Sequence, residues 1–235
     1  MIALFCLILL ASCEKDNFEG PDAQFFGSIK DAKNGELVET ELQNGSVIEV
    51  FELGYENPIS QKWLIKNNGE FRNNLVFPNK YDIYLRNCNF YQQEFKEFEI
   101  RSGANEHHFE VVPYIRIKNA NITFDKTNNK VVATFSLEGG KPEVQVKNIR
   151  LYAFSDMHVG EAVKFDVKNS IDRRENINQV IDPATVYTLE IDLDKNSTMF
   201  KTGRDYFFRI GALANLSGQG TVRHNFAPYI KLSIK

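Results

Sequence analysis

The pattern closest to a catalytic motif in this sequence is a histidine followed three residues later by a glutamate. His158 and Glu161 have this spacing, and His224 lies further along the chain. Imidazole nitrogens and carboxylate oxygens bind zinc, so these three residues could form the ligand set of a zinc-dependent hydrolase. His158 and Glu161 fall in an expected loop after a strand that ends at Phe154. We therefore expect a solvated loop here, and we keep zinc hydrolysis as the alternative.

A second kind of chemistry is carbohydrate binding by aromatic side chains. Flat rings stack on sugar faces, while amides and carboxylates bond sugar hydroxyls. Trp63 is the single tryptophan, and Tyr55 and Asn57 are near it in sequence; Tyr84 and Tyr91 offer further rings. We take Tyr55, Trp63, Tyr84 and Tyr91 as candidate ligand-binding residues. The alternative for Trp63 is a place in the core, which is common for a lone tryptophan in a small sandwich.

Other reactive residues do not form a recognisable catalytic group. His107 and His108 are adjacent, so on a strand they point to opposite faces and cannot share a metal ion. The sequence also lacks the Gly-x-Ser-x-Gly pattern of serine hydrolases. We therefore predict a protein that is not an enzyme and that uses no cofactor and no metal.

The first thirteen residues indicate export. Nine apolar residues, Ile2 to Leu10, lead into Ala11-Ser12-Cys13, a run too short to span a bilayer. The ending resembles the lipobox of bacterial lipoproteins, which implies a signal peptide over 1–12 and lipid on Cys13. Residues 13–21, which are polar from Glu14 onward, are expected to form a lipidated tether. Two or more acyl chains would anchor the protein stably.

The acidic residues after the cysteine bear on localisation. Glu14, Asp16 and Glu19 resemble the surface-export signal of Bacteroidetes lipoproteins. This resemblance implies the outer membrane, with the protein on the cell surface. The alternative interpretation is a soluble acidic tether that carries no export signal.

Composition limits the possible partners. The chain has 28 basic and 31 acidic side chains and a formal net charge of −3, so it lacks the basic surface that nucleic-acid binding requires. After removal of the signal and lipidation of Cys13, Cys88 is the one remaining thiol, which rules out an intrachain disulfide. Folding must depend on apolar burial, for which 19 Phe and 9 Tyr are ample.

The elements that position these residues are β-strands. Asn34-Gly35, Asn44-Gly45 and Asn68-Gly69 favour tight turns, and side chains alternate between apolar and polar in segments such as 80–87. The expected strands are 25–30, 46–53, 62–66, 70–75, 80–87, 95–100, 107–112, 121–124, 130–137, 147–154, 186–193, 205–213 and 227–234. We predict an all-β protein of two consecutive β-sandwich domains.

The first half resembles a carboxypeptidase-regulatory-like domain, a small transthyretin-like sandwich. The segments that match are Phe26 to Asp31, Asn34-Gly35-Glu36, Asn68-Gly69-Glu70-Phe71 and Pro78 to Ile83. In that family a strand and turn open the domain, and a Pro-x-x-Tyr turn leads into a core strand. The resemblance covers residues 22–112.

The second half, 113–235, begins at Pro113, because proline is rare in a central strand. Segments 206–212 and 229–234 resemble the last two strands of an immunoglobulin or fibronectin type III sandwich. Residues 171–180 could form one short helix or a loop.

Taken whole, the chain resembles a family of two-domain Bacteroidetes lipoproteins encoded near SusC/SusD-type glycan-uptake systems. The resemblance implies an accessory or binding protein in nutrient capture, with glycan as the expected ligand and a SusC/SusD-type complex as an expected partner. The alternative is a spacer or protein-docking module of an envelope complex.

Overall fold

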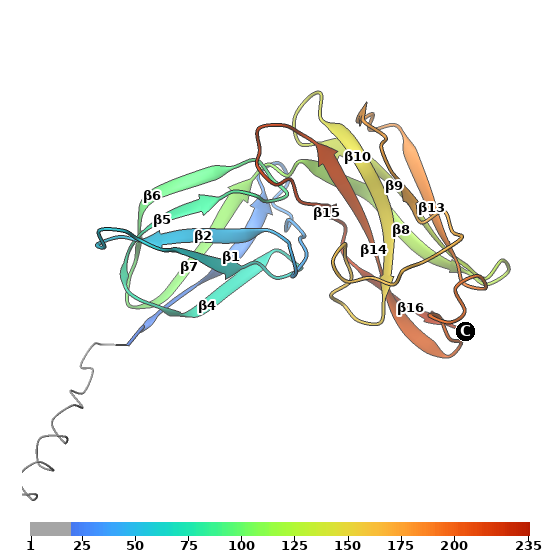
Figure 1. Ribbon diagram of the computed structural model, residues 1–235, viewed down its shortest axis with the longest axis horizontal. Helices are drawn as coiled ribbons and strands as arrows, with labels where there is room; N and C mark the ends of the chain where they lie inside the picture. Colours follow the sequence, from blue (N-terminus) through green and yellow to red (C-terminus); the bar gives the residue numbers. More distant parts are fainter. Residues whose placement is uncertain (1–19) are drawn as a thin grey trace, which may run out of the picture.

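The computed structural model describes residues 20–235, which form two β-sandwich domains side by side (Figure 1). No helix occurs among these residues, so the predicted fold class is confirmed. The expected signal peptide and Cys13 lie outside the described residues. Within the described part, no helix is long and apolar enough to cross a membrane.

The N-terminal domain packs a three-stranded sheet against a four-stranded sheet. Its strands are β1 (Ala23–Asp31), β2 (Val47–Glu52), β3 (Ser60–Leu64), β4 (Glu70–Val76), β5 (Asn79–Leu85), β6 (Gln93–Ile100) and β7 (Gly103–Val111). The sheet orders are β4-β1-β7 and β3-β2-β5-β6. β1 pairs in parallel with β7, whereas all other pairs in this domain are antiparallel.

Gly27 lies where β1 runs closest to β7. A Cβ atom at this position would sit 1.6 Å from the backbone oxygen of His107, and the φ angle is 157°. A side chain here would have to push the two paired strands apart. The close parallel pairing therefore depends on glycine.

Each domain has its own hydrophobic core. In the N-terminal domain the ring of Phe25 is central, and its centroid lies 5.7 Å from that of Trp63 and 5.2 Å from that of Phe71. Because the chain cannot form a disulfide among its described residues, such aromatic packing provides much of the stability.

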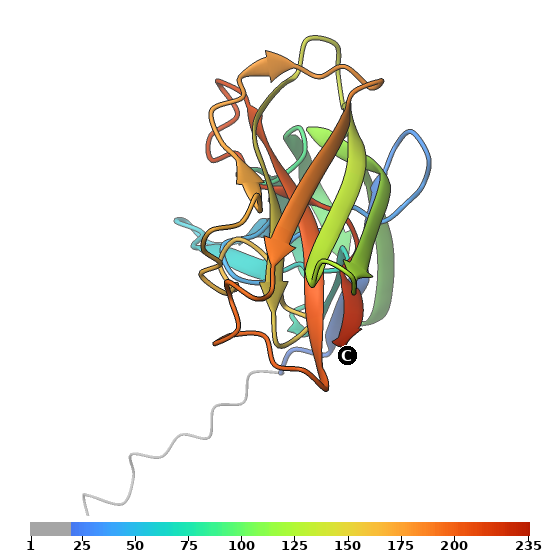
Figure 2. The ribbon, with the colours of Figure 1, turned by 90° about the vertical axis from the view of Figure 1, so that its right-hand side faces the viewer.

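The C-terminal domain also consists of two sheets. Its strands are β8 (Ile115–Asp125), β9 (Lys130–Gly139), β10 (Gln145–Phe154), β11 (Arg173–Arg174), β12 (Gln179–Val180), β13 (Val186–Asp192), β14 (Arg204–Asn215), β15 (Asn225–Phe226) and β16 (Ile230–Ile234). One sheet has the order β13-β9-β8, seen side by side in Figure 2 in orange, yellow-green and green. In the other, β10 and β14 form the centre.

Two segments differ from the sequence-based prediction. Residues 171–180 form neither a helix nor a simple loop, because β11 and β12 pair with β10. β8 is much longer than the expected 121–124. Its register shifts between Lys118 and Asn121, and Asn119 has a φ of 53°, so a bulge breaks the alternation that would have revealed the first part of the strand.

A buried arginine joins the two domains. Arg209, on β14, is fully buried, and its guanidinium donates to Glu39 Oε2 at 2.5 Å and to the carbonyl of Asn67 at 3.0 Å. Both acceptors belong to the N-terminal domain. Burial raises the pKa of Glu39 and lowers that of Arg209, and the ion pair opposes both shifts.

Further paired polar groups complete this junction. Arg116 donates to both carboxylate oxygens of Asp31, at 2.5 and 2.7 Å. Burial alone would raise the pKa of Asp31, but the bonds from Arg116 hold it below its usual value. Asn89 donates to the carbonyls of Glu39 and His224, at 2.7 and 3.1 Å. These directional bonds fix one domain on the other.

Candidate functional site

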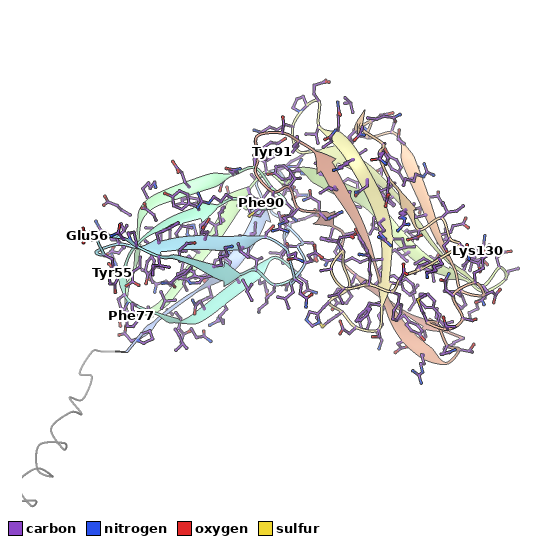
Figure 3. The ribbon with its side chains drawn as sticks, in the orientation of Figure 1. Tyr55, Glu56, Phe77, Phe90, Tyr91 and Lys130 are labelled. Atoms are coloured by element: carbon purple, nitrogen blue, oxygen red, sulfur yellow. The ribbon has the colours of Figure 1, made fainter. Side chains whose placement is uncertain are left out.

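An exposed tyrosine beside unpaired polar groups lies at the end of the N-terminal domain that points away from the C-terminal domain (Figure 3). A cavity of about 250 Å³ is formed here by Glu52, Tyr55, Asn57, Ile59 and Gln61. We call it the Tyr55 pocket. The side chain of Tyr55 is 65% exposed, so its ring is open to a ligand.

The hairpin of β2 and β3 positions these residues. Phe51 on β2 pairs with Ser60 on β3, so Glu52 and Gln61 come together at the base of the connecting loop. The loop is fixed at its start by two bonds: Leu53 donates its N–H to the carbonyl of Lys80, and Asn79 donates to the carbonyl of Leu53, both at 2.9 Å.

Polar atoms in the pocket remain available for a ligand. Asn79 donates to one oxygen of Glu52 at 3.1 Å, and the indole N–H of Trp63 donates to the side-chain oxygen of Gln61 at 3.4 Å. Within residues 20–235, the second oxygen of Glu52, the NH₂ of Gln61 and the amide of Asn57 have no hydrogen bond. A ring face with a carboxylate and two amides suits a sugar, which has apolar C–H faces and hydroxyls at its edge.

Trp63 is placed in the core and not at the surface. Its side chain is 8% exposed, and its ring contacts those of Phe25 and Tyr81 at centroid distances of 5.7 Å. The ring face therefore cannot stack on a sugar. Trp63 contributes to the pocket by orienting Gln61, which makes it a positioning residue.

Tyr84 and Tyr91 lie elsewhere, so the structure does not bring the four candidates together. Tyr84 is on the outer face of β5, where the ammonium of Lys96 bonds its hydroxyl and lies 4.3 Å from the ring centroid. Tyr91 lies at the junction (Figure 3), where it packs on Tyr114 at 4.9 Å and beneath the ammonium of Lys141. Both rings are already engaged by neighbouring side chains.

The three residues considered for zinc are likewise separated. His158 contacts Asp156 at 3.2 Å, while Glu161 and His224 line a different cavity in the C-terminal domain. In the described part of the chain, no group of three or more His, Cys, Asp or Glu side chains could hold a metal ion. The zinc alternative therefore has no ligand set among these residues.

Cys88 is equally unsuited to chemistry. The thiol is fully buried, and burial raises its pKa to about 11, so it stays protonated at neutral pH. A protonated, inaccessible thiol is a poor nucleophile and behaves as a small core residue.

Two larger cavities, of about 740 and 560 Å³, flank the domain junction on either side of Arg116. The guanidinium of Arg116 is already bonded to Asp31, and Asn225 is bonded to Asn89. The one aromatic residue in their walls, Phe226, is 7% exposed. Unlike the Tyr55 pocket, they offer no exposed ring on which a sugar could stack.

Comparison with known proteins agrees with this architecture. Residues 23–112 match the family described as "Protein of unknown function (DUF3823) N-terminal domain", and residues 115–228 match "Domain of unknown function (DUF3823_C)". No curated protein matches the chain.

Several solved structures match this chain across both of its domains. The chain is similar to a "putative carbohydrate binding protein" from Bacteroides uniformis ATCC 8492, with 47% identity and a TM-score of 0.87, over 92% of this chain and all of that one. DUF3823 family proteins from Bacteroides uniformis ATCC 8492 and Parabacteroides merdae ATCC 43184 share the fold. They are 17% and 18% identical, with TM-scores of 0.73 and 0.70, again over 92% of this chain and all of theirs. The protein belongs to the two-domain DUF3823 family.

Sequence reasoning found part of this site and missed the rest. It selected Tyr55 and noted Asn57, because both lie in a loop close in sequence to Trp63. It missed Glu52 and Gln61, which are nine residues apart and meet only through the pairing of β2 with β3. The sequence signal that could have found Glu52 and Gln61 is that both are polar residues beside the turn of an expected hairpin.

Proposed function

We propose that the protein is a non-catalytic carbohydrate-binding protein of the cell envelope, and that it binds glycan in the Tyr55 pocket. The observation that carries this proposal is the exposed ring of Tyr55 beside the unpaired groups of Glu52, Asn57 and Gln61. The 47% identical relative, which is described in terms of carbohydrate binding, supports the ligand class. Aromatic stacking supplies affinity, and the polar groups select the hydroxyl pattern.

Titration calorimetry against a panel of soluble polysaccharides tests the pocket. For the polysaccharide that binds, Tyr55→Ala is expected to weaken affinity about 5- to 30-fold, since a stacked ring contributes about 1 to 2 kcal/mol. Tyr84→Phe is the matched control, because this tyrosine lies outside the pocket, and it should bind as the parent protein does. Equal affinity of Tyr55→Ala and parent protein would exclude this pocket.

The envelope location is part of the same proposal. Lipid on Cys13 holds the protein at the outer membrane, and the acidic residues of the tether direct it to the cell surface, beside a SusC/SusD-type transporter that takes up the captured glycan. The apolar run before Cys13 and the acidic residues after it support this.

Replacement of the cysteine tests the anchor. Cys13→Ala is expected to move the protein from the outer-membrane fraction to a soluble fraction, and mass spectrometry of the parent protein should find acyl groups on Cys13. An unmodified amino terminus in the parent protein would refute lipid anchoring.

The buried junction favours one second function, a spacer or docking module that holds a partner at a fixed place. Binding to the polysaccharide panel and binding to a purified SusC/SusD-type complex together distinguish docking from glycan capture. A protein that binds a purified SusC/SusD-type complex, and none of the polysaccharides, acts in docking.

A further inference from the structure

A small cavity in the C-terminal domain gathers polar side chains that the proposed function does not use. Its volume is about 110 Å³. Four inner residues, Arg150, Tyr152, Glu161 and His224, line it together with the exposed Arg173 and Glu175. We call it the Tyr152 cavity.

A glycine on the central strand makes room for it. Gly211 on β14 pairs with Arg150 on one side and with Phe226 on the other. A Cβ atom on Gly211 would lie 2.6 Å from the ring of Tyr152. Without that atom, the ring of Tyr152 crosses β14 and approaches Phe226 and His224, at centroid distances of 5.9 and 6.4 Å.

Some polar atoms around the cavity have hydrogen-bonding capacity left, although Glu161 Oε1 already accepts from Lys164 at 2.7 Å. The hydroxyl of Tyr152 is buried, in a residue that is 1% exposed, and it makes no hydrogen bond within residues 20–235. Glu161 lies next to this hydroxyl and, like burial, raises the pKa of Tyr152. Leaving a buried polar group unpaired costs about 1 to 3 kcal/mol, so a water or ligand hydroxyl that bonds this group would be stabilising.

The guanidinium of Arg150 also has hydrogen-bond donors that are not well satisfied. Its guanidinium lies 3.4 Å from Asp172 and 3.9 Å from Glu161, which are ion-pair contacts and not well-aligned hydrogen bonds. One oxygen of Asp172 is itself buried without a hydrogen-bond partner. Asp172 lies outside the cavity wall, which itself presents Arg150 and Tyr152 as donors and Glu161 as an acceptor.

The charges around the cavity indicate a neutral ligand. The charges of Arg150, Lys164 and Arg173 are balanced by their ion-pair partners Glu161, Asp172 and Glu175. Burial lowers the pKa of His224 to about 4, so this ring is uncharged at neutral pH. A ligand that both donates and accepts hydrogen bonds, without net charge, complements this set best.

We propose that the Tyr152 cavity binds vicinal hydroxyls of a neutral sugar residue. The volume is sufficient for a few water molecules or for the hydroxylated edge of one sugar ring, and sugar hydroxyls can form the hydrogen bonds that water would make there. Tyr152 donates to one hydroxyl, and Glu161 accepts from its neighbour. The inference shares its ligand class with the proposed function but uses a different site in the other domain.

Nuclear magnetic resonance of the histidine rings in the full chain tests it. Methyl glycosides of glucose, galactose and mannose are titrated separately, and the ring signals of His224 are assigned with His224→Gln. At least one glycoside is expected to give a saturable shift of the His224 signals. Tyr152→Phe should weaken that binding about tenfold, the loss of one or two buried hydrogen bonds. Its thermal midpoint should stay equal or rise, since it removes only an unpaired hydroxyl.

Two controls separate this site from others. Tyr55→Ala must leave the His224 shift intact, so failure of the Tyr55 pocket and failure of the Tyr152 cavity give different results. Sodium phosphate must give no saturable shift. The inference is overturned if no glycoside shifts His224, if Tyr152→Phe binds like the parent protein, if Tyr55→Ala abolishes the shift, or if phosphate produces it.

Discussion

At the scale of single residues, the buried ring of His224 makes the stability of the fold depend on pH. Its ring packs against Tyr152 and Phe226, and burial disfavours the charged imidazolium, while Glu161 opposes this only in part. The pKa in the folded state is about 4, against 6.5 for the ordinary side chain. The unfolded chain therefore binds a proton at this residue in a pH range where the folded chain does not.

The free energy of unfolding should consequently fall with acidification. The contribution of His224 is fully present above pH 6.5 and is lost as the pH decreases towards 4, by an amount of about 3 kcal/mol. His224→Gln has no such proton to bind, so its stability should decline less over this range. Urea unfolding at several pH values measures both slopes. His158→Gln, in an exposed loop, is the control and should follow the parent protein; parallel curves for His224→Gln and parent protein would refute the coupling.

At the scale of elements, the pairing of β1 with β7 depends on one residue. Gly27→Ala would place a Cβ atom against the carbonyl of His107 and force the strands apart. We expect a loss of about 3 kcal/mol or more in the free energy of unfolding, because backbone atoms cannot move aside as a flexible side chain can.

Denaturant unfolding of Gly27→Ala measures this loss. Gly20→Ala provides the comparison, since a Cβ atom there meets no atom within 4 Å, and it should change stability by less than about 0.5 kcal/mol. Similar stability of the two variants would show that the strands adjust without cost.

Strands were predictable where alternation and turn residues coincide. Asn68-Gly69 marks the turn from β3 to β4, and Gly69 has a φ of 84°, as a tight turn requires. The prediction failed where alternation is interrupted: the bulge at Asn119 concealed half of β8, and β11 and β12 are two residues each, too short to show a period. For the Tyr55 pocket, an exposed aromatic in a loop was visible in the sequence, but the pairing that brings Gln61 to Glu52 was not.

At the scale of the whole molecule, one ion pair links distant parts of the chain. Arg209 and Glu39 are 170 residues apart, and neither has a neighbour in sequence that marks it as a contact between domains. Because the environment of a buried charge is set by tertiary packing, composition alone gave no sign that this arginine would be inaccessible.

Removing one partner should therefore be severe. Arg209→Met leaves Glu39 without its counter-charge and removes one of the two donors to the carbonyl of Asn67, and we expect a loss of about 3 to 5 kcal/mol in the free energy of unfolding. Calorimetry should also show two transitions in place of one, because the domains are no longer tied together.

The control is Arg204→Met, at the exposed end of the same strand, which should change stability by less than about 0.5 kcal/mol. The double variant Glu39→Met with Arg209→Met should be more stable than Arg209→Met alone, since it removes the unpaired carboxylate as well. A double variant that is less stable than the single one would contradict this explanation.

The shared arginine also has an evolutionary consequence. A domain that ends at its own surface can be recombined freely with other modules, but here each half presents polar groups that are satisfied only by the other. Exchange of either domain for an unrelated sandwich would leave Arg209 or Glu39 without its partner at the domain junction. The two domains are thus expected to be inherited as one unit, with substitutions on one side of the domain junction compensated by substitutions on the other.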